Sequence, residues 1–92
     1  MFYLVSYDIQ DDRSRLKAMK YLKDHGYHFQ KSVFVVDCDS RPQATEIYNT
    51  VLQMLDQEHD RLLMTPVCST CWDKALMFGN TYLAVEDQVW IV

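Results

Sequence analysis

The sequence predicts a single α+β domain of the ferredoxin-like βαββαβ type, and its length and element order support this prediction. The 92 residues suffice for one small domain spanning positions 1–92. Strand-like and helix-like patterns alternate along the chain, with two helical stretches among at least four extended ones. Two helices packed against four strands in this order are typical of the split βαβ sandwich.

The opening of the chain predicts a strand followed closely by a helix. Residues 2–8 are rich in strand-forming aromatic and aliphatic side chains and contain no breaker. Asp11 or Asp12 can cap the next helix, and Gly26 is expected to end it. The buried stripe expected for this helix comprises Leu16, Met19 and Leu22, with Lys23 turned partly inward and Ala18 beside Leu22.

Residues 27–36 are expected to form a second strand, which ends in an apolar run. Lys31 and Ser32 interrupt its alternation, so a bulge or an edge position is expected there. If a hairpin lies between the helices instead, the element order becomes βαββαβ. A turn is expected at residues 37–39.

The second helix is predicted by both its start and its period. Ser40 and Gln43 have the spacing of a capping box, and Pro42 is tolerated in a first helical turn. Apolar residues then recur with helical spacing at Ala44, Ile47, Tyr48, Val51, Met54 and Leu55.

The last third of the chain is expected to be mostly extended. Pro66 favours an edge or an end for the strand at residues 61–67. The other expected elements are a loop at 68–71, a short strand at 72–78, a turn at 79–80 and extended pieces at 81–85 and 89–92. A strand within about residues 80–92 exceeds what the fold requires and is suited to pair with a second subunit, which predicts a homodimer.

Charge and composition narrow the classes of function. The net charge is -4, but residues 1–31 carry six Lys/Arg against four Asp, while residues 32–92 carry three against nine acidic side chains. Basic side chains therefore gather where the first strand meets its helix, and local charge steers phosphate backbones. No apolar run reaches the length of a membrane span and no signal peptide is recognisable, so a cytoplasmic protein without membrane association is expected.

Asp8 is the first candidate functional residue, because a strand end holds a carboxylate rigidly. It can simply be a turn residue, although Asp11 and Asp12 already serve as caps. Carboxylate oxygens suit Mg²⁺, but one aspartate alone is a poor metal site. A two-fold dimer would supply a second carboxylate, and the metal could then generate hydroxide for attack on a phosphodiester.

Two other groups of side chains invite a functional interpretation. Arg13, Arg15 and Lys17 could bind phosphate near Asp8, or could form an ordinary solvated helix face. Cys68 and Cys71 are interpreted as structural or incidental thiols. A structural zinc site takes four ligands, and a redox Cys-x-x-Cys usually opens a helix, whereas this pair precedes an expected strand.

The chain resembles a known family in three segments. These are Tyr3-Leu4-Val5-Ser6-Tyr7-Asp8-Ile9-x-Asp11-Asp12-x-x-Arg15, then Gln30-x-Ser32-Val33-Phe34, and finally Pro66-Val67-Cys68-x-x-Cys71. Together they resemble the small CRISPR-associated nuclease family, the second of the two universal proteins of spacer acquisition. The chain has His28 and Lys17 where some members have arginine.

The resemblance implies a fold, an activity and partners. It implies a ferredoxin-like homodimer with exchanged C-terminal strands, Mg²⁺-dependent cleavage of RNA or double-stranded DNA, and bridging of CRISPR integrase subunits. By position, Asp8 would bind the metal beside Tyr7, and Phe34 would support the site. Nucleic-acid contacts are expected from Arg13, Arg15, Lys17 and Lys31, with Arg15 also in the catalytic set. The alternatives are a non-catalytic scaffold and a toxin-like ribonuclease of the same fold.

Overall fold

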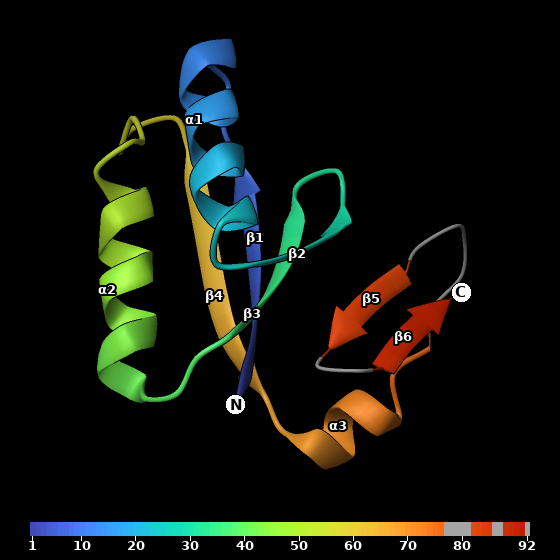
Figure 1. Ribbon diagram of the computed structural model, residues 1–92. Helices are drawn as coiled ribbons and strands as arrows, with labels where there is room; N and C mark the ends of the chain where they lie inside the picture. The colour runs from blue at the N-terminus through green and yellow to red at the C-terminus, as the bar shows by residue number, and fades with distance from the viewer. Residues whose placement is uncertain (77–81, 86–87, 92) are drawn as a thin grey trace.

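The computed structural model describes residues 1–76, 82–85 and 88–91 of the chain (Figure 1). Its elements in chain order are β1 (Phe2–Asp8), α1 (Asp12–Lys23), β2 (Gly26–Gln30), β3 (Val33–Asp37), α2 (Arg41–Leu52), β4 (Arg61–Val67), α3 (Ser69–Asp73), β5 (Tyr82–Val85) and β6 (Gln88–Ile91). Four strands form one antiparallel sheet in the order β2-β3-β1-β4. This confirms the predicted ferredoxin-like α+β fold.

Helices α1 and α2 lie on the same face of the four-stranded sheet (Figure 1). The core between them is formed by alternate residues of the strands and by one face of each helix. Its buried members include Val5, Tyr7, Phe34 and Val36 from the sheet and Ala18, Leu22, Ala44, Ile47 and Val51 from the helices. The period of two in β1 therefore decides which side chains enter the core.

Both predicted helix starts are confirmed, each by a capping side chain. Asp11 accepts a hydrogen bond from the Ser14 N–H at 2.9 Å, and Ser40 accepts one from the Gln43 N–H at 3.2 Å. These bonds satisfy backbone donors that have no partner inside the helix. Both helices bury part of their predicted apolar stripe, with Ala18 and Leu22 in α1 and Ala44, Ile47 and Val51 in α2. Leu16 is 48% exposed, and Met54 and Leu55 lie beyond the end of α2, where they are partly buried.

The prediction of one strand over residues 27–36 was wrong, because the chain reverses within it. β2 and β3 are antiparallel partners joined by a turn at Lys31 and Ser32, which gives the βαββαβ order. The register shift lies between His28 and Gln30 rather than at the turn. Lys31 and Ser32, where a bulge or an edge position was expected, therefore form the turn of the hairpin.

The prediction that Gly26 ends the first helix was wrong, because Gly26 is the first residue of β2. The helix ends at Lys23, with Asp24 as its C-cap. A Cβ atom at Gly26 would lie 2.3 Å from the Val35 carbonyl oxygen. Glycine is required here because the backbone of β3 approaches closely.

The predictions of a loop at 68–71 and a strand at 72–78 were wrong within the described residues. Residues 69–73 form α3, and Cys68 is its N-cap. Trp72 lies 6% exposed with its ring 6.0 Å from that of Phe2 and 6.5 Å from that of Phe29. Burial of this indole against the sheet favours a helical turn over continued extension. Residues 77–78 of that expected strand and the turn at 79–80 lie outside the described residues.

The extended pieces expected near the C-terminus are confirmed where they are described. β5 and β6 pair with each other in an antiparallel two-stranded sheet, and β5 also contacts β2. Exchange of a C-terminal strand between subunits stays a prediction. Among the described residues, no helix is long and apolar enough to cross a membrane.

Candidate functional site

Asp8 is the last residue of β1, and its side chain is exposed on the sheet face opposite α1 and α2. In the antiparallel register it lies beside Arg61 of β4, and Ser6 lies between Val33 and Leu63. We call Ser6, Asp8, Val33, Arg61 and Leu63 the Asp8 surface. Its most exposed apolar side chain is Leu63, at 58%.

The Asp8 carboxylate is held by the strand and not by other side chains. Among the described residues, no side chain forms an ion pair or hydrogen bond with it. The loop that follows is fixed by Asp60, whose carboxylate accepts from the Gln10 N–H at 3.1 Å and from the Asp56 N–H at 2.9 Å. The backbone of Asp8 is thus fixed by the sheet, and its carboxylate is free to bind a ligand.

Tyr7 and Phe34 lie on the other face of the sheet, inside the core. Tyr7 is 5% exposed and Phe34 is fully buried, with ring centroids 6.2 Å apart. Phe34 also stacks on His28 at 4.4 Å. Burial raises the pKa of the Tyr7 hydroxyl, and the positive charge of Arg15 partly opposes this rise. The structure therefore separates both aromatic residues from Asp8 by the thickness of the sheet.

Arg15 lies at the same end of the sheet as Asp8, anchored to the connection between β1 and α1. Its guanidinium donates to the Ile9 carbonyl oxygen at 3.1 Å and forms an ion pair with Asp12. The side chain remains 46% exposed. Because a guanidinium has five N–H donors, two such contacts leave donors for a phosphate.

A pocket of about 360 Å³ adjoins Arg15 on the helix side of the sheet. Tyr7, His28 and Lys31 also line it, and the His28 imidazole contacts the Lys31 carbonyl oxygen at 3.2 Å. Lys31 is exposed in the turn between β2 and β3. The structure thus brings together three of the predicted site residues, Tyr7, Arg15 and Lys31.

Arg13 and Lys17 are exposed on α1. Neither side chain has an ion-pair partner among the residues that the structure describes. Both are therefore available to an anionic partner. They line neither the pocket beside Tyr7 nor the Asp8 surface.

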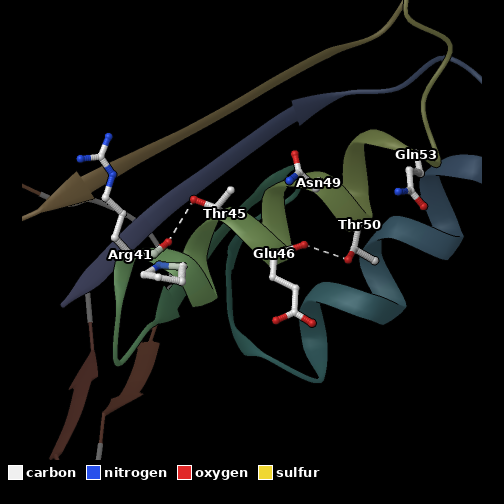
Figure 2. Close-up of a pocket in the computed structure, with 7 residues that line it drawn as sticks. Arg41, Thr45, Glu46, Asn49, Thr50 and Gln53 are labelled. Carbon is white, nitrogen blue, oxygen red and sulfur yellow. Dashed lines mark hydrogen bonds between the residues drawn. The ribbon is translucent and has the colours of Figure 1, made fainter.

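Another concave surface, of about 690 Å³, lies on the outer side of α2, away from all predicted site residues (Figure 2). The hydroxyl groups of Thr45 and Thr50 donate to carbonyl oxygens one turn earlier in the helix, those of Arg41 and Glu46. These two hydroxyl groups are therefore occupied by hydrogen bonds within α2. The lining residues are Arg41, Pro42, Thr45, Glu46, Asn49, Thr50 and Gln53.

Two residues of the site were missed from the sequence. Arg61 lies beside Asp8, and Asp60 fixes the loop after it. The signal for both is the β1–β4 register, which joins positions about fifty residues apart. The register cannot be read from a single sequence. The sequence shows only that Asp60 belongs to a polar run at residues 56–60.

One chain contributes a single candidate metal ligand, the Asp8 carboxylate, to the site. No group of three or more His, Cys, Asp or Glu side chains that could hold a metal ion exists within the described residues. Asp8 could bind Mg²⁺ only together with ligands from elsewhere, such as a second copy of this chain and water.

Comparison with known proteins agrees with this fold and motif pattern. The family model of CRISPR associated protein Cas2 matches residues 1–75. The chain belongs to the Cas2 family. Cas2 relatives include the CRISPR-associated endoribonuclease Cas2 1 of Chloroflexus aurantiacus, 38% identical over 82 residues that cover 87% of this chain and 86% of the relative.

Two further Cas2 proteins are similar along most of the chain. The CRISPR-associated endoribonuclease Cas2 4 of Rhodospirillum rubrum is 33% identical over 90 residues, 98% of this chain and 72% of that protein. The crystal structure of Streptococcus pyogenes Cas2 at pH 6.5 superposes with a TM-score of 0.75 at 20% identity, covering 86% of this chain and all of that one. At 20% identity, the similarity to this crystal structure supports the fold alone.

Proposed function

We propose that this Cas2 protein is a Mg²⁺-dependent endonuclease of CRISPR adaptation, which cleaves phosphodiester bonds in RNA or double-stranded DNA. The observation that supports this best is the exposed, unpaired Asp8 carboxylate at a rigid strand end. Two similar Cas2 proteins are named endoribonucleases, which is consistent with such chemistry. The proposal includes a homodimer and an integrase subunit as partners in spacer acquisition.

The exposed side chains of the Asp8 surface support the homodimer. Leu63 is 58% exposed, and Ser6 beside it and Val33 on the far side of Ser6 are only partly buried. A two-fold contact between copies of this surface would remove these groups from water, at about 25 cal/mol per Å² of apolar area. The same contact would bring two Asp8 carboxylates together.

Two carboxylates and several waters are a ligand set that Mg²⁺ commonly takes. The bound metal would supply a hydroxide nucleophile and neutralise charge on the phosphate. The chain's own contribution is to hold the backbone of Asp8 in place, through the β1–β4 ladder and the Asp60 contacts.

The cationic side chains have different roles in this proposal. Arg13 and Lys17, exposed on α1, bind the phosphate backbone, and Lys31 does so from its turn. Arg15 both anchors the loop after β1 and offers its remaining donors to phosphate. Tyr7 and Phe34 support the strand from the core side.

A second candidate function is a non-catalytic dimeric scaffold that holds integrase subunits and DNA. The observation favouring it is that each chain contributes one carboxylate, with no further metal-ligating cluster among the described residues. In this case the Asp8 surface would serve dimerisation alone.

Substitution Asp8→Asn distinguishes the two functions. We expect metal-dependent cleavage of single-stranded RNA or double-stranded DNA to fall at least about 100-fold, on the scale of losing a main source of electrostatic stabilisation. The dimer should persist, because the change is nearly isosteric and removes a repulsion between like charges. The measurement compares cleavage with Mg²⁺ and with EDTA, alongside gel filtration.

Asp39→Asn is the matched control, since it removes the same charge from an exposed carboxylate in the turn after β3. Full cleavage by Asp8→Asn would rule out the catalytic assignment. Spacer acquisition that survives Asp8→Asn but is lost on deletion of residues 89–92 would favour the scaffold.

A further inference from the structure

Two exposed thiols lie side by side at the start of α3, away from the Asp8 surface. Cys68 is the N-cap of the helix and Cys71 is its third residue. The Cys71 N–H donates to the Cys68 sulfur at 3.4 Å. The Cys68 side chain is therefore directed at the residue that carries the second thiol, while the third cysteine, Cys38, is buried.

We propose that Cys68 and Cys71 form a reversible redox pair, oxidised to an intramolecular disulfide by exchange with low-molecular-weight disulfides. A redox Cys-x-x-Cys usually opens a helix, and the sequence predicted a strand after this pair. The structure instead has helix α3 there, which removes that objection. Both cysteines are exposed, as exchange with a small reagent requires.

The two thiols differ in chemical role. The N–H and thiol of Cys71 that face the Cys68 sulfur lower the pKa of Cys68. The Cys68 sulfur in turn raises the pKa of Cys71, by hydrogen bonding and by its charge. Because the thiolate is the nucleophile, Cys68 attacks first and Cys71 resolves.

The exchange balances in two steps. The Cys68 thiolate attacks one sulfur of the small disulfide, whose S–S bond breaks, so that one small thiol leaves and takes up a proton. Cys71 then loses its proton to water and attacks the Cys68 sulfur of the mixed disulfide, releasing the second small thiol. Overall, two protein thiols and one small disulfide become one protein disulfide and two small thiols.

A metal site explains the pair less well. A structural zinc site takes four ligands, and no third His, Cys, Asp or Glu joins these cysteines in the part of the chain that the structure describes. Redox exchange needs only the two sulfur atoms that are present.

The test is a titration of the full chain in mixtures of reduced and oxidised glutathione, followed by acid quenching, alkylation and intact mass measurement. We expect two thiols to disappear together as one disulfide between positions 68 and 71, located by peptide mapping, while Cys38 stays alkylatable after unfolding. Cys38→Ser is the control and should leave the titration unchanged.

The single variants test the division of roles. Cys71→Ser should accumulate a glutathione adduct on Cys68 faster than Cys68→Ser accumulates one on Cys71, because the backbone N–H of residue 71 still faces the Cys68 sulfur in the first variant. A wild-type protein that binds two glutathiones without an internal disulfide would overturn the proposal. Equal rates in the two variants would overturn the assignment of Cys68 as the attacking thiol.

Discussion

The two faces of the four-stranded sheet differ in how far their side chains are buried. On the face covered by α1 and α2, Val5, Phe34 and Val36 are at most 1% exposed. On the other face, Trp72 covers the end near Phe2, while the end with Asp8 and Leu63 stays open. The covered face supplies the burial on which stability depends, and the open end supplies a surface available to a partner.

Tyr7 and Asp8 show how finely this division is made. They are consecutive in β1, yet one is buried in the core and the other is exposed on the opposite face. Because strand side chains alternate, two neighbours in a sequence motif need not belong to one site. The motif around Asp8 therefore combines a structural requirement with a proposed chemical one.

The largest effect is expected when the covered face is damaged. Phe34→Ala should lower the free energy of unfolding by about 3–5 kcal/mol, because it removes a fully buried ring and leaves a cavity. Leu63→Ala, on the open face, should cost about 0.5 kcal/mol or less in dilute protein. Urea denaturation of both variants measures the contrast, and equal losses would show that the two faces do not differ in this way.

Self-association should depend on the open face of the sheet and not on the exposed surface of α1. Leu63→Lys places a charge in the proposed dimer contact and should weaken association at least about tenfold, as expected from losing one buried leucine. Leu16→Lys is the matched control, since Leu16 is 48% exposed but lies on α1. Sedimentation measures the dissociation constant for each. A wild-type chain that stays monomeric at micromolar concentrations would contradict the proposed dimer.

Local signals in the sequence predicted much of this fold. The strand before Asp8 and the two capped helices follow from residues close together in the chain, such as Ser40 and Gln43. A hairpin between the helices was an open alternative, but its turn at residues 31–32 was not located, because Lys-Ser lacks the glycine or asparagine that usually marks a tight turn. Helix α3 was missed because the aromatic Trp72 favours extended structure locally, whereas its packing on Phe2 is a long-range contact.

The candidate site was only partly predictable for the same reason. Asp8 and the exposed cations of α1 could be selected from type and position alone. The place of Arg61 beside Asp8 depends on pairing between strands more than fifty residues apart. The alternation of side chains in a strand predicts that Tyr7 and Asp8 point to opposite faces of the sheet. It does not predict which of the two faces the helices cover.

The smallest expected effect is a pH dependence that arises on the covered face alone. Burial raises the pKa of Tyr7, so the folded protein keeps this proton at a pH where the unfolded chain, with a tyrosine pKa of about 10, has lost it. The stabilisation is complete below about pH 10 and declines as the pH rises toward the folded-state pKa, by at most about 1.4 kcal/mol per pH unit for one proton. Tyr7→Phe lacks this proton, so its stability should decline less steeply than that of the wild type. Urea midpoints between about pH 8 and pH 11 measure both slopes, and parallel profiles would show that the Tyr7 hydroxyl titrates alike in the folded and unfolded chains.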